Sequence, residues 1–184
     1  SQMSNSLDCL FYPSSVAVIG ASSTPGKWGF NILNRLLKSR TSTRVFPVRR
    51  GGGDVQGRRA YSSLSEIPDP IDLAVIAVPP EEVPKAMQEC ADKGVKVAII
   101  ITAGFKETGQ VGAQLESDIL KIARGGGVRF VGPNCMGHFN TVNDLFTVNE
   151  WGIRPGPLAL ISQSGNFGSY IMQRAVDRGA GFSK

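Results

Sequence analysis

A glycine-rich stretch near the start of the chain combines small and hydroxyl side chains in a pattern typical of anion binding. It runs from Gly20 to Gly29 and reads GASSTPGKWG. Glycines let backbone N–H groups approach a phosphate at a helix N-terminus, and Ser22, Ser23 and Thr24 add hydroxyl donors. The spacing matches neither the dinucleotide fingerprint nor the P-loop, so it predicts a phosphate site without specifying the ligand. A tight strand-to-helix turn with an N-cap serine is the alternative.

Two consecutive arginines, Arg49 and Arg50, stand where a second strand is expected to end. A dinucleotide-binding domain that takes NAD usually has Asp or Glu at this point to hold a ribose hydroxyl, whereas guanidinium groups suit a ribose that carries a phosphate. The pair therefore favours CoA, with its 3′-phosphate, or NADP, with its 2′-phosphate, over NAD. Sequence position alone leaves both ligands open.

Three further segments follow expected strands and would line the same crevice. They contain Val78, Pro79, Ile101, Thr102, Ala103, Asn134 and Cys135. The first offers an apolar wall and the second offers backbone groups beside a glycine, although either could be a turn that begins a helix. A later loop with Ser164, Gly165 and Asn166 repeats the anion-site chemistry between a strand and a helix.

The sequence does not bring together a catalytic set or a metal cluster. The single histidine, His138, has no carboxylate or second ligand placed near it, which favours a structural role. Cys135 has no identifiable base beside it, so a buried, inert thiol is the default interpretation. Three widely spaced cysteines, Cys9, Cys90 and Cys135, follow no CxxC or Cys/His pattern and are expected to be reduced thiols.

The elements that position these loops follow from hydrophobic periodicity. Short runs rich in valine and isoleucine predict strands buried on both faces at 16–19, 45–48, 73–78, 95–101, 128–131 and 158–161. Helical spacing between them predicts apolar helix faces that contain Phe30, Leu33 and Leu37; Val83, Met87, Cys90 and Ala91; Leu115, Ile119 and Ile122; and Phe167, Ile171 and Ala175. This alternation predicts an α/β fold with a doubly wound parallel sheet, whose ligands bind at the carboxyl ends of the strands.

The chain of 184 residues is long enough for one well-buried domain and the start of another. We expect a first domain over 8–140 and an interdomain connection over 141–157, where Asn, Gly and Pro replace periodicity. Residues 158–184 would then form the first βα unit of a second, truncated domain.

Composition and charge limit the classes of partner that the protein can have. The hydrophobic share of 41% and charged share of 19% suit an ordinary globular protein, and no apolar run approaches the ~20 residues that span a bilayer. The polar start lacks the pattern of a signal peptide, so we expect the cytoplasm. A net charge of +5 with five arginines between Arg44 and Arg59 suits an acidic partner. Few stacking aromatics accompany them, which favours a small phosphorylated ligand over nucleic acid, with a solvated basic face as an equal alternative for any single arginine.

Six segments taken in order resemble the NDP-forming acyl-CoA synthetases, typified by ADP-forming acetyl-CoA synthetase and related to the succinyl-CoA synthetase α subunit. They are SVAVIGASSTPGKWG, PVRRGGG, DLAVIAVP, IITAGFKETG, VGPNCMG and LALISQSGNFG. Each alone is a weak signal, but six in the same order over 8–184 are specific.

The resemblance implies a Rossmann-like domain that binds CoA or acyl-CoA. By similarity, the loop that contacts the CoA phosphates contains Gly20, Ser22, Ser23 and Pro25, and Arg50 stands about where relatives often have lysine. The adenine, pantetheine and thiol would lie along Val78, Pro79, Ile101, Thr102, Ala103, Asn134 and Cys135. Arg49-Arg50 departs from the Asn followed by Pro-Lys of many relatives, which leaves the exact phosphate partner there open.

The resemblance also implies a reaction for a longer protein. Acyl-CoA and phosphate give an acyl phosphate, which phosphorylates a histidine in a flavodoxin-like second domain, and the phosphohistidine then reaches ADP on an ATP-grasp domain. Ser164, Gly165 and Asn166 resemble one of the helix N-termini that stabilise this phosphohistidine. The histidine itself would lie beyond Lys184, and His138 does not match its position. The rest of the synthetase, with ATP or ADP and Mg²⁺, is the expected partner, and this fragment is expected to bind without catalysing.

Two other functions remain open at this point. The same domain could sense CoA or acyl-CoA in a regulatory protein, for example fused to a protein acetyltransferase. An NADP-dependent oxidoreductase domain is the other alternative, but it predicts a GxGxxG loop that the sequence lacks.

Overall fold

The computed structural model describes residues 6–148 and 152–184 and centres on a five-stranded parallel sheet. Its strands, in the spatial order β2-β1-β5-β6-β7, are β1 (Ser15–Ile19), β2 (Arg44–Val48), β5 (Leu73–Ile76), β6 (Val97–Ile100) and β7 (Arg129–Val131). The spatial order reverses between β1 and β5, and an open sheet forms its crevice at such a point. The doubly wound, Rossmann-like α/β fold predicted from the sequence is confirmed. The first residues of the polar start, and part of the expected interdomain connection, lie outside the described residues.

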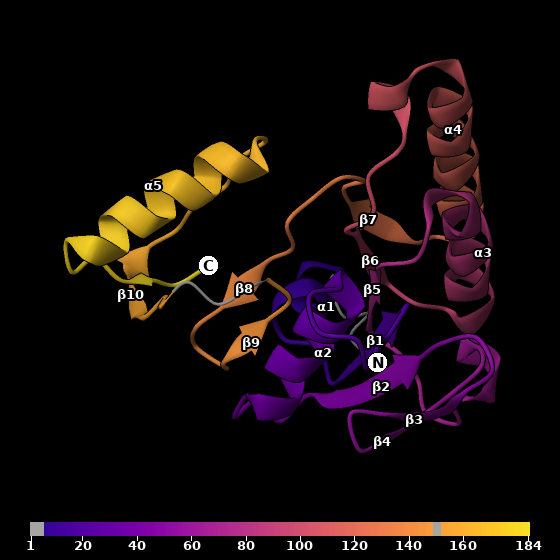
Figure 1. Ribbon diagram of the computed structural model, residues 1–184, viewed down its shortest axis with the longest axis horizontal. Coiled ribbons are helices and arrows are strands. Elements are labelled where there is room, and N and C mark those ends of the chain that lie inside the picture. The colour runs from indigo at the N-terminus through magenta and orange to yellow at the C-terminus, as the bar shows by residue number, and fades with distance from the viewer. Residues whose placement is uncertain (1–5, 149–151) are drawn as a thin grey trace.

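Helices cover both faces of this sheet (Figure 1). On one face lie α1 (Ser6–Phe11) and α2 (Trp28–Lys38), and on the other lie α3 (Val83–Lys93) and α4 (Gln110–Gly125). Successive side chains of a strand point to opposite faces. Ala17 and Ile19 of β1 therefore pack in the cluster with α3 and α4, whereas Val16 and Val18 pack with α1 and α2.

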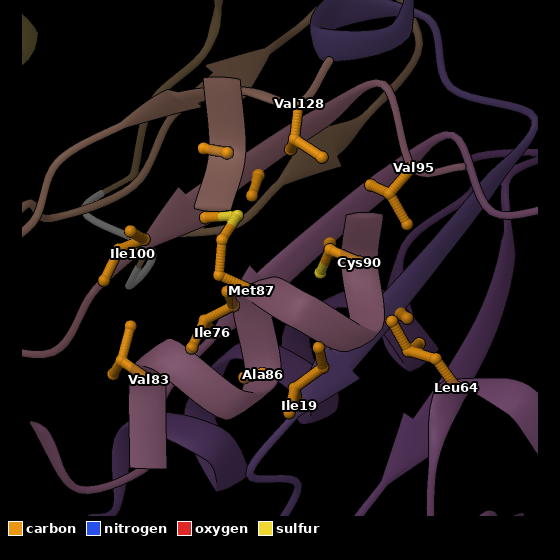
Figure 2. Packing of buried hydrophobic residues seen from close by; sticks show 14 of the residues in the cluster. Ile19, Leu64, Ile76, Val83, Ala86, Met87, Cys90, Val95, Ile100 and Val128 are labelled. Carbon is orange, nitrogen blue, oxygen red and sulfur yellow. The ribbon is translucent and has the colours of Figure 1, made fainter. Parts of the chain in front are cut away.

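Helix α3 shows how the sequence directs this packing. Its buried residues, Val83, Ala86, Met87 and Cys90, follow the spacing of one face of an amphipathic helix. Figure 2 shows Met87 between this helix and the sheet, close to Ile76. The helix ends at Lys93, and Gly94, which caps it, adopts the left-handed conformation that favours glycine at this position.

The prediction that all strands are buried on both faces holds only in the centre of the sheet. Every residue of β1, β5 and β6 is buried, whereas β2 and β7 are partly exposed. Each of these two strands has a strand neighbour on only one side, and Val131 at the end of β7 remains 43% exposed. Periodicity alone does not say which strand lies at an edge.

Two small hairpins and three 3₁₀ turns complete the domain and were not predicted. The strands are β3 (Gly53–Val55) with β4 (Arg58–Ala60), and β8 (Phe139–Asn140) with β9 (Leu145–Phe146); the turns are η1 (Leu64–Glu66), η2 (Pro80–Glu82) and η3 (Lys106–Thr108). The strands of the hairpins are only two or three residues long, too short to show alternation.

The last part of the chain forms β10 (Pro155–Leu158) and α5 (Gly165–Asp177), which extend away from the sheet in Figure 1. The predicted helix start near Gly165 is confirmed, but the predicted strand over 158–161 is wrong. The strand ends at Leu158, and Ile161 is 100% exposed. A short apolar run indicates an extended segment without locating the backbone groups that pair.

The prediction of the buried face was also wrong for two helices, α5 and α2. Helix α5 buries Gly168, Met172 and Val176, and the predicted Phe167 is 61% exposed. Helix α2 buries Gly29, Ile32, Leu33 and Leu36, so of the predicted face only Leu33 is fully buried. Both helices are apolar on more than one side, and the neighbour that covers a side is decided by tertiary packing.

A third apolar cluster links α5 to the segment that follows the sheet. It contains Phe139, Phe146, Val148, Met172, Val176 and Phe182. The Thr141 hydroxyl donates to the Phe182 carbonyl oxygen over 2.7 Å. The expected domain boundaries stay a prediction. No helix in 6–148 or 152–184 is both long and apolar enough to cross a membrane.

We predict that Met87→Ala lowers the free energy of unfolding by about 3 kcal/mol, because it leaves a cavity between α3 and the sheet. Urea unfolding measures this value. The neighbouring Gln88 is exposed, and Gln88→Ala should change stability by less than about 0.5 kcal/mol. Equal losses in the two variants would contradict the assigned packing.

Candidate functional site

A cavity of about 1330 Å³ lies at the carboxyl ends of the parallel strands. It is lined by the loop before α2, the ends of β5 and β6, the loop after β7 and the loop before α5, with further lining residues from η3 and α4. The cavity therefore lies where the order of the strands reverses, which is where ligands bind in this type of sheet.

Most of the residues expected from the sequence line this cavity together. They are Gly20, Val78, Pro79, Ile101, Thr102, Ala103, Asn134, Cys135, Ser164, Gly165 and Asn166. Four others do not line it: Ser22, Ser23, Pro25 and Arg50. The three of these from the first loop belong to the same turn as lining residues, whereas Arg50 lies beyond the end of β2.

Close backbone contacts shape the first wall of the cavity. A Cβ atom on Gly20, whose φ is +95°, would come within 2.5 Å of the Ala77 carbonyl oxygen at the end of the neighbouring strand. A Cβ atom on Gly29 would lie 1.9 Å from the Gly20 carbonyl oxygen. Only glycine permits both approaches, which bring the start of α2 against the ends of β1 and β5.

Hydrogen bonds join the remaining walls in series. The Thr102 hydroxyl donates to the Val78 carbonyl oxygen over 2.6 Å, which ties the end of β6 to the end of β5. The Asn134 backbone N–H donates to the Thr102 carbonyl oxygen over 2.9 Å, which adds the loop after β7. These bonds hold three adjacent strand ends in one fixed arrangement.

The N-terminus of α5 closes the far side. Ser164 caps this helix, and its hydroxyl accepts a bond from the Phe167 N–H over 3.3 Å. A Cβ atom on Gly165 would lie 2.6 Å from Cγ of Met136, so the helix start packs directly on the loop after β7. Two helix N-termini, those of α2 and α5, thus border one cavity, and both favour negative charge.

The comparison with protein families identifies the domain that contains this cavity. A model of the CoA-binding domain family matches residues 14–141. The chain belongs to this family. The matched range includes every strand of the central sheet, from β1 to β7.

Individual relatives are similar to the chain over nearly its whole length. It is 43% identical to the α subunit of an ADP-forming acetate–CoA ligase II from Pyrococcus furiosus, over 97% of this chain and 39% of that protein. A crystal structure from Pyrococcus horikoshii OT3 matches with a TM-score of 0.91 and 42% identity, over 96% of this chain and 40% of that one. A dinucleotide forming acetyl-coenzyme A synthetase 1 from Ca. Korarchaeum cryptofilum, solved with phosphate and ADP, matches with a TM-score of 0.90 and 36% identity, over 96% and 38% of the two chains.

The resemblance found in the sequence is therefore confirmed: this is a CoA-binding domain that matches the α subunit of ADP-forming acyl-CoA synthetases. The chain spans about 40% of the length of the first relatives it matches.

The predicted set of site residues leaves out several residues that line the cavity, among them Lys27 and Trp28. Lys27 is the N-cap residue of α2 and Trp28 its first residue, and both line the cavity. Lys27 brings a positive charge and Trp28 an indole that is 38% exposed. Their position just before an expected helix was the available signal, because residues at a helix N-terminus share its anion site.

The basic stretch around β2 has partners within the protein. Arg44 pairs with Asp69, the Arg49 Nε donates to the Gly52 carbonyl oxygen over 2.8 Å, and Arg50 pairs with Glu82 over 2.9 Å. The Arg50 side chain is 87% exposed. An exposed pair of this kind contributes little to stability, so Glu82 does not prevent Arg50 from meeting another anion.

Neither Cys135 nor His138 has the surroundings of a catalytic group. Burial raises the pKa of the Cys135 thiol, whose sulfur accepts a bond from the Gly137 N–H over 3.3 Å. The His138 Nε2 lies 2.6 Å from the Leu10 carbonyl oxygen, which can only accept, so this nitrogen carries the proton. Nδ1 then accepts from the Thr147 hydroxyl over 2.8 Å. The ring links α1 to the β8–β9 hairpin.

We predict that His138 makes stability depend on pH. Burial lowers the pKa of His138 from 6.5 to about 4 in the folded protein. As the pH falls between these values, the unfolded chain binds a proton that the folded chain does not, so stability is lost in this window. The loss should be about 2 kcal/mol, below the full value for such a shift because the residue is partly exposed.

The variant His138→Gln tests this effect, because it keeps a donor for Leu10 and does not titrate. Urea unfolding at about pH 7 and about pH 4 should show a smaller decrease for the variant than for the unchanged chain. The same pH dependence in both proteins would rule out His138 as its source.

Proposed function

We propose that this domain holds CoA or acyl-CoA in the cavity described above, as the CoA-binding part of an ADP-forming acyl-CoA synthetase. The observation that carries the proposal is the position of the cavity, which extends from the N-terminus of α2 across three strand ends to the N-terminus of α5. Its volume of about 1330 Å³ is above the roughly 300–1,000 Å³ of most small-molecule pockets and suits a long ligand.

The phosphates of the ligand would bind at the loop before α2, where backbone N–H groups and the helix dipole attract anions. Gly20, Ser22, Ser23 and Pro25 shape this loop, and Lys27 adds a positive charge. The adenine, pantetheine and thiol would continue along the other walls, formed by Val78, Pro79, Ile101, Thr102, Ala103, Asn134 and Cys135. The Cys135 thiol packs beside the ligand in this arrangement and does not react.

Arg50 would bind the 3′-phosphate of CoA once its ion pair with Glu82 is broken. Three features support this role: the exposure of the side chain, its place just beyond the end of β2, and the low strength expected of its exposed ion pair.

We propose that the complete protein is an acid–thiol ligase, in which acyl-CoA, phosphate and ADP give acid, CoA and ATP through a phosphohistidine. Residues 8–140 would form the CoA-binding domain, 141–157 the connection, and 158–184 the start of a flavodoxin-like domain. Ser164, Gly165 and Asn166 would stabilise anions at the N-terminus of α5. The phosphohistidine, the nucleotide and Mg²⁺ would belong to regions outside this chain, which by itself would bind CoA without turnover. The names of its relatives support this activity.

We also propose a cytoplasmic location and no nucleic-acid or membrane partner. The three cysteines are free thiols, as expected in a reducing compartment. Arg44, Arg49 and Arg50 have polar partners within the protein. The aromatic rings beside this stretch, Phe46 and Tyr61, already lie against Arg44 and Arg59.

Calorimetric titration with CoA, acetyl-CoA and NADP tests the proposed ligand. We expect binding of both thiol nucleotides, and Lys27→Gln should weaken CoA binding about tenfold because it removes a charge at the phosphate end. Lys38, the last residue of α2, is exposed and outside the cavity lining, so Lys38→Gln should leave affinity unchanged. Binding of NADP without CoA would instead point to an oxidoreductase domain.

A pair of variants tests the role of Arg50. Arg50→Glu should weaken CoA much more than dephospho-CoA, by about tenfold, because only CoA carries the 3′-phosphate. Glu82→Gln removes the competing carboxylate and should strengthen CoA binding without affecting dephospho-CoA. Equal changes for the two ligands would refute the contact.

A further inference from the structure

The turn between β3 and β4 contains a glutamine in an unfavourable backbone conformation. Gln56 has a φ of 53° and Gly57 a φ of 74°, and the strands on either side pair Val55 with Arg58. Two-residue turns of this type favour Asn, Asp or Gly at the first position, because a larger side chain in the left-handed region costs energy. A residue kept in such a conformation suggests a role for its side chain.

The side chain of Gln56 reaches two carbonyl groups distant in the sequence. Its Nε2 donates to the Ser22 carbonyl oxygen over 2.9 Å and to the Phe30 carbonyl oxygen over 3.1 Å. Both partners can only accept, so the amide nitrogen must face them. Asparagine, favoured at this turn position, is one methylene too short to make the same bonds from the same backbone.

These two carbonyl groups lie at opposite ends of the loop that borders the cavity. Ser22 lies at its beginning, and Phe30 is the third residue of α2. Between them, the N–H groups of Gly26, Trp28 and Gly29 have no acceptor among the described residues, and all three residues line the cavity. One amide group thus joins the ends of a loop in which these three donors are free for a ligand.

The β3–β4 hairpin that contains Gln56 is anchored in the core of the domain. Val55 is 0% and Ala60 4% exposed, and both belong to the apolar cluster beneath α2. The Asp54 carboxylate accepts a bond from the Gly57 N–H over 3.1 Å, which fixes the turn itself. The position of the amide is therefore determined by the core and does not depend on the loop that it holds.

We propose that Gln56 is a positioning residue, which holds the loop of residues 22–30 in the conformation that leaves its N–H groups open to the phosphates of the ligand. The residue lies outside the cavity lining and acts through Ser22 and Phe30. The inference rests on the proposed function for the identity of the ligand, but not for the state of the loop.

Gln56→Asn separates this role from a general effect on stability. The substitution suits the turn better, so the melting temperature should change little, while the two bonds to the loop are lost. The affinity for CoA should fall about tenfold, and the affinity for pantetheine, which lacks the phosphates, should stay the same. Equal loss for both ligands, or no loss for CoA, would overturn the proposal.

The matched control is Gln88→Asn on α3, where the Gln88 side chain is exposed and donates to Asp92 one turn further along the same helix. It should leave the affinity for both ligands unchanged. A fall in CoA affinity in this control would show that the assay responds to unrelated substitutions and would remove the support for Gln56.

Hydrogen–deuterium exchange tests the state of the loop without a ligand. The hydrogen-bonded backbone amides of the loop, those of Thr24, Lys27 and Phe30, should exchange faster in Gln56→Asn than in the unchanged chain, and those in β5 should not change. If the unchanged chain fails to bind CoA, the proposed function is wrong. The exchange measurement then still tests whether Gln56 holds the loop. Identical exchange in the loop would overturn the positioning role in either case.

Discussion

The close approach of β1 to β5 at their carboxyl ends is the constraint on which the rest of the structure depends. Gly20 passes so near the Ala77 carbonyl oxygen that no side chain fits between them. Because the strand order reverses here, the loop from β1 and the loop from β5 diverge to opposite faces and leave a crevice. The start of α2 can then pack on Gly20 through Gly29, and the bonds of Thr102 extend the same edge to the loop after β7.

The chemistry of this cavity depends more on backbone groups than on charged side chains. Among the described residues that line it, the cations are Lys27 and Lys106, and Lys106 lies 3.7 Å from Glu116. At the same rim, a bond from the Gly104 N–H lowers the pKa of Glu107 and keeps that carboxyl group ionised. Negative ligands are favoured at the two helix N-termini, where aligned peptide dipoles act at short range. Arg44, Arg49 and Arg50 of the basic stretch have partners outside the cavity.

The cavity lies between the sheet and the last helix of the chain. Met136 packs against the start of α5, and the cluster around Phe139 and Phe146 holds the buried face of the same helix. The opposite face of α5 is apolar and exposed, with Phe167 at 61% and Tyr170 at 62%. The helix is therefore held by one side only, and its N-terminus is placed at the cavity by contacts with the segment that leaves the sheet.

By itself, the sequence determined the class of fold, the loops at the strand ends and the family, because buried strands, helix spacing and ordered motifs are local patterns. Most of the site residues that it predicted also line the cavity, since the carboxyl ends of parallel strands must meet. Tertiary structure decided which strands lie at the edges, which side of α2 and α5 is covered, and where β10 pairs. It also decided that Arg50 pairs with Glu82, that Lys27 and Trp28 line the cavity, and that Gln56 binds the first loop. These outcomes depend on contacts between segments far apart in the chain, which a local pattern does not contain.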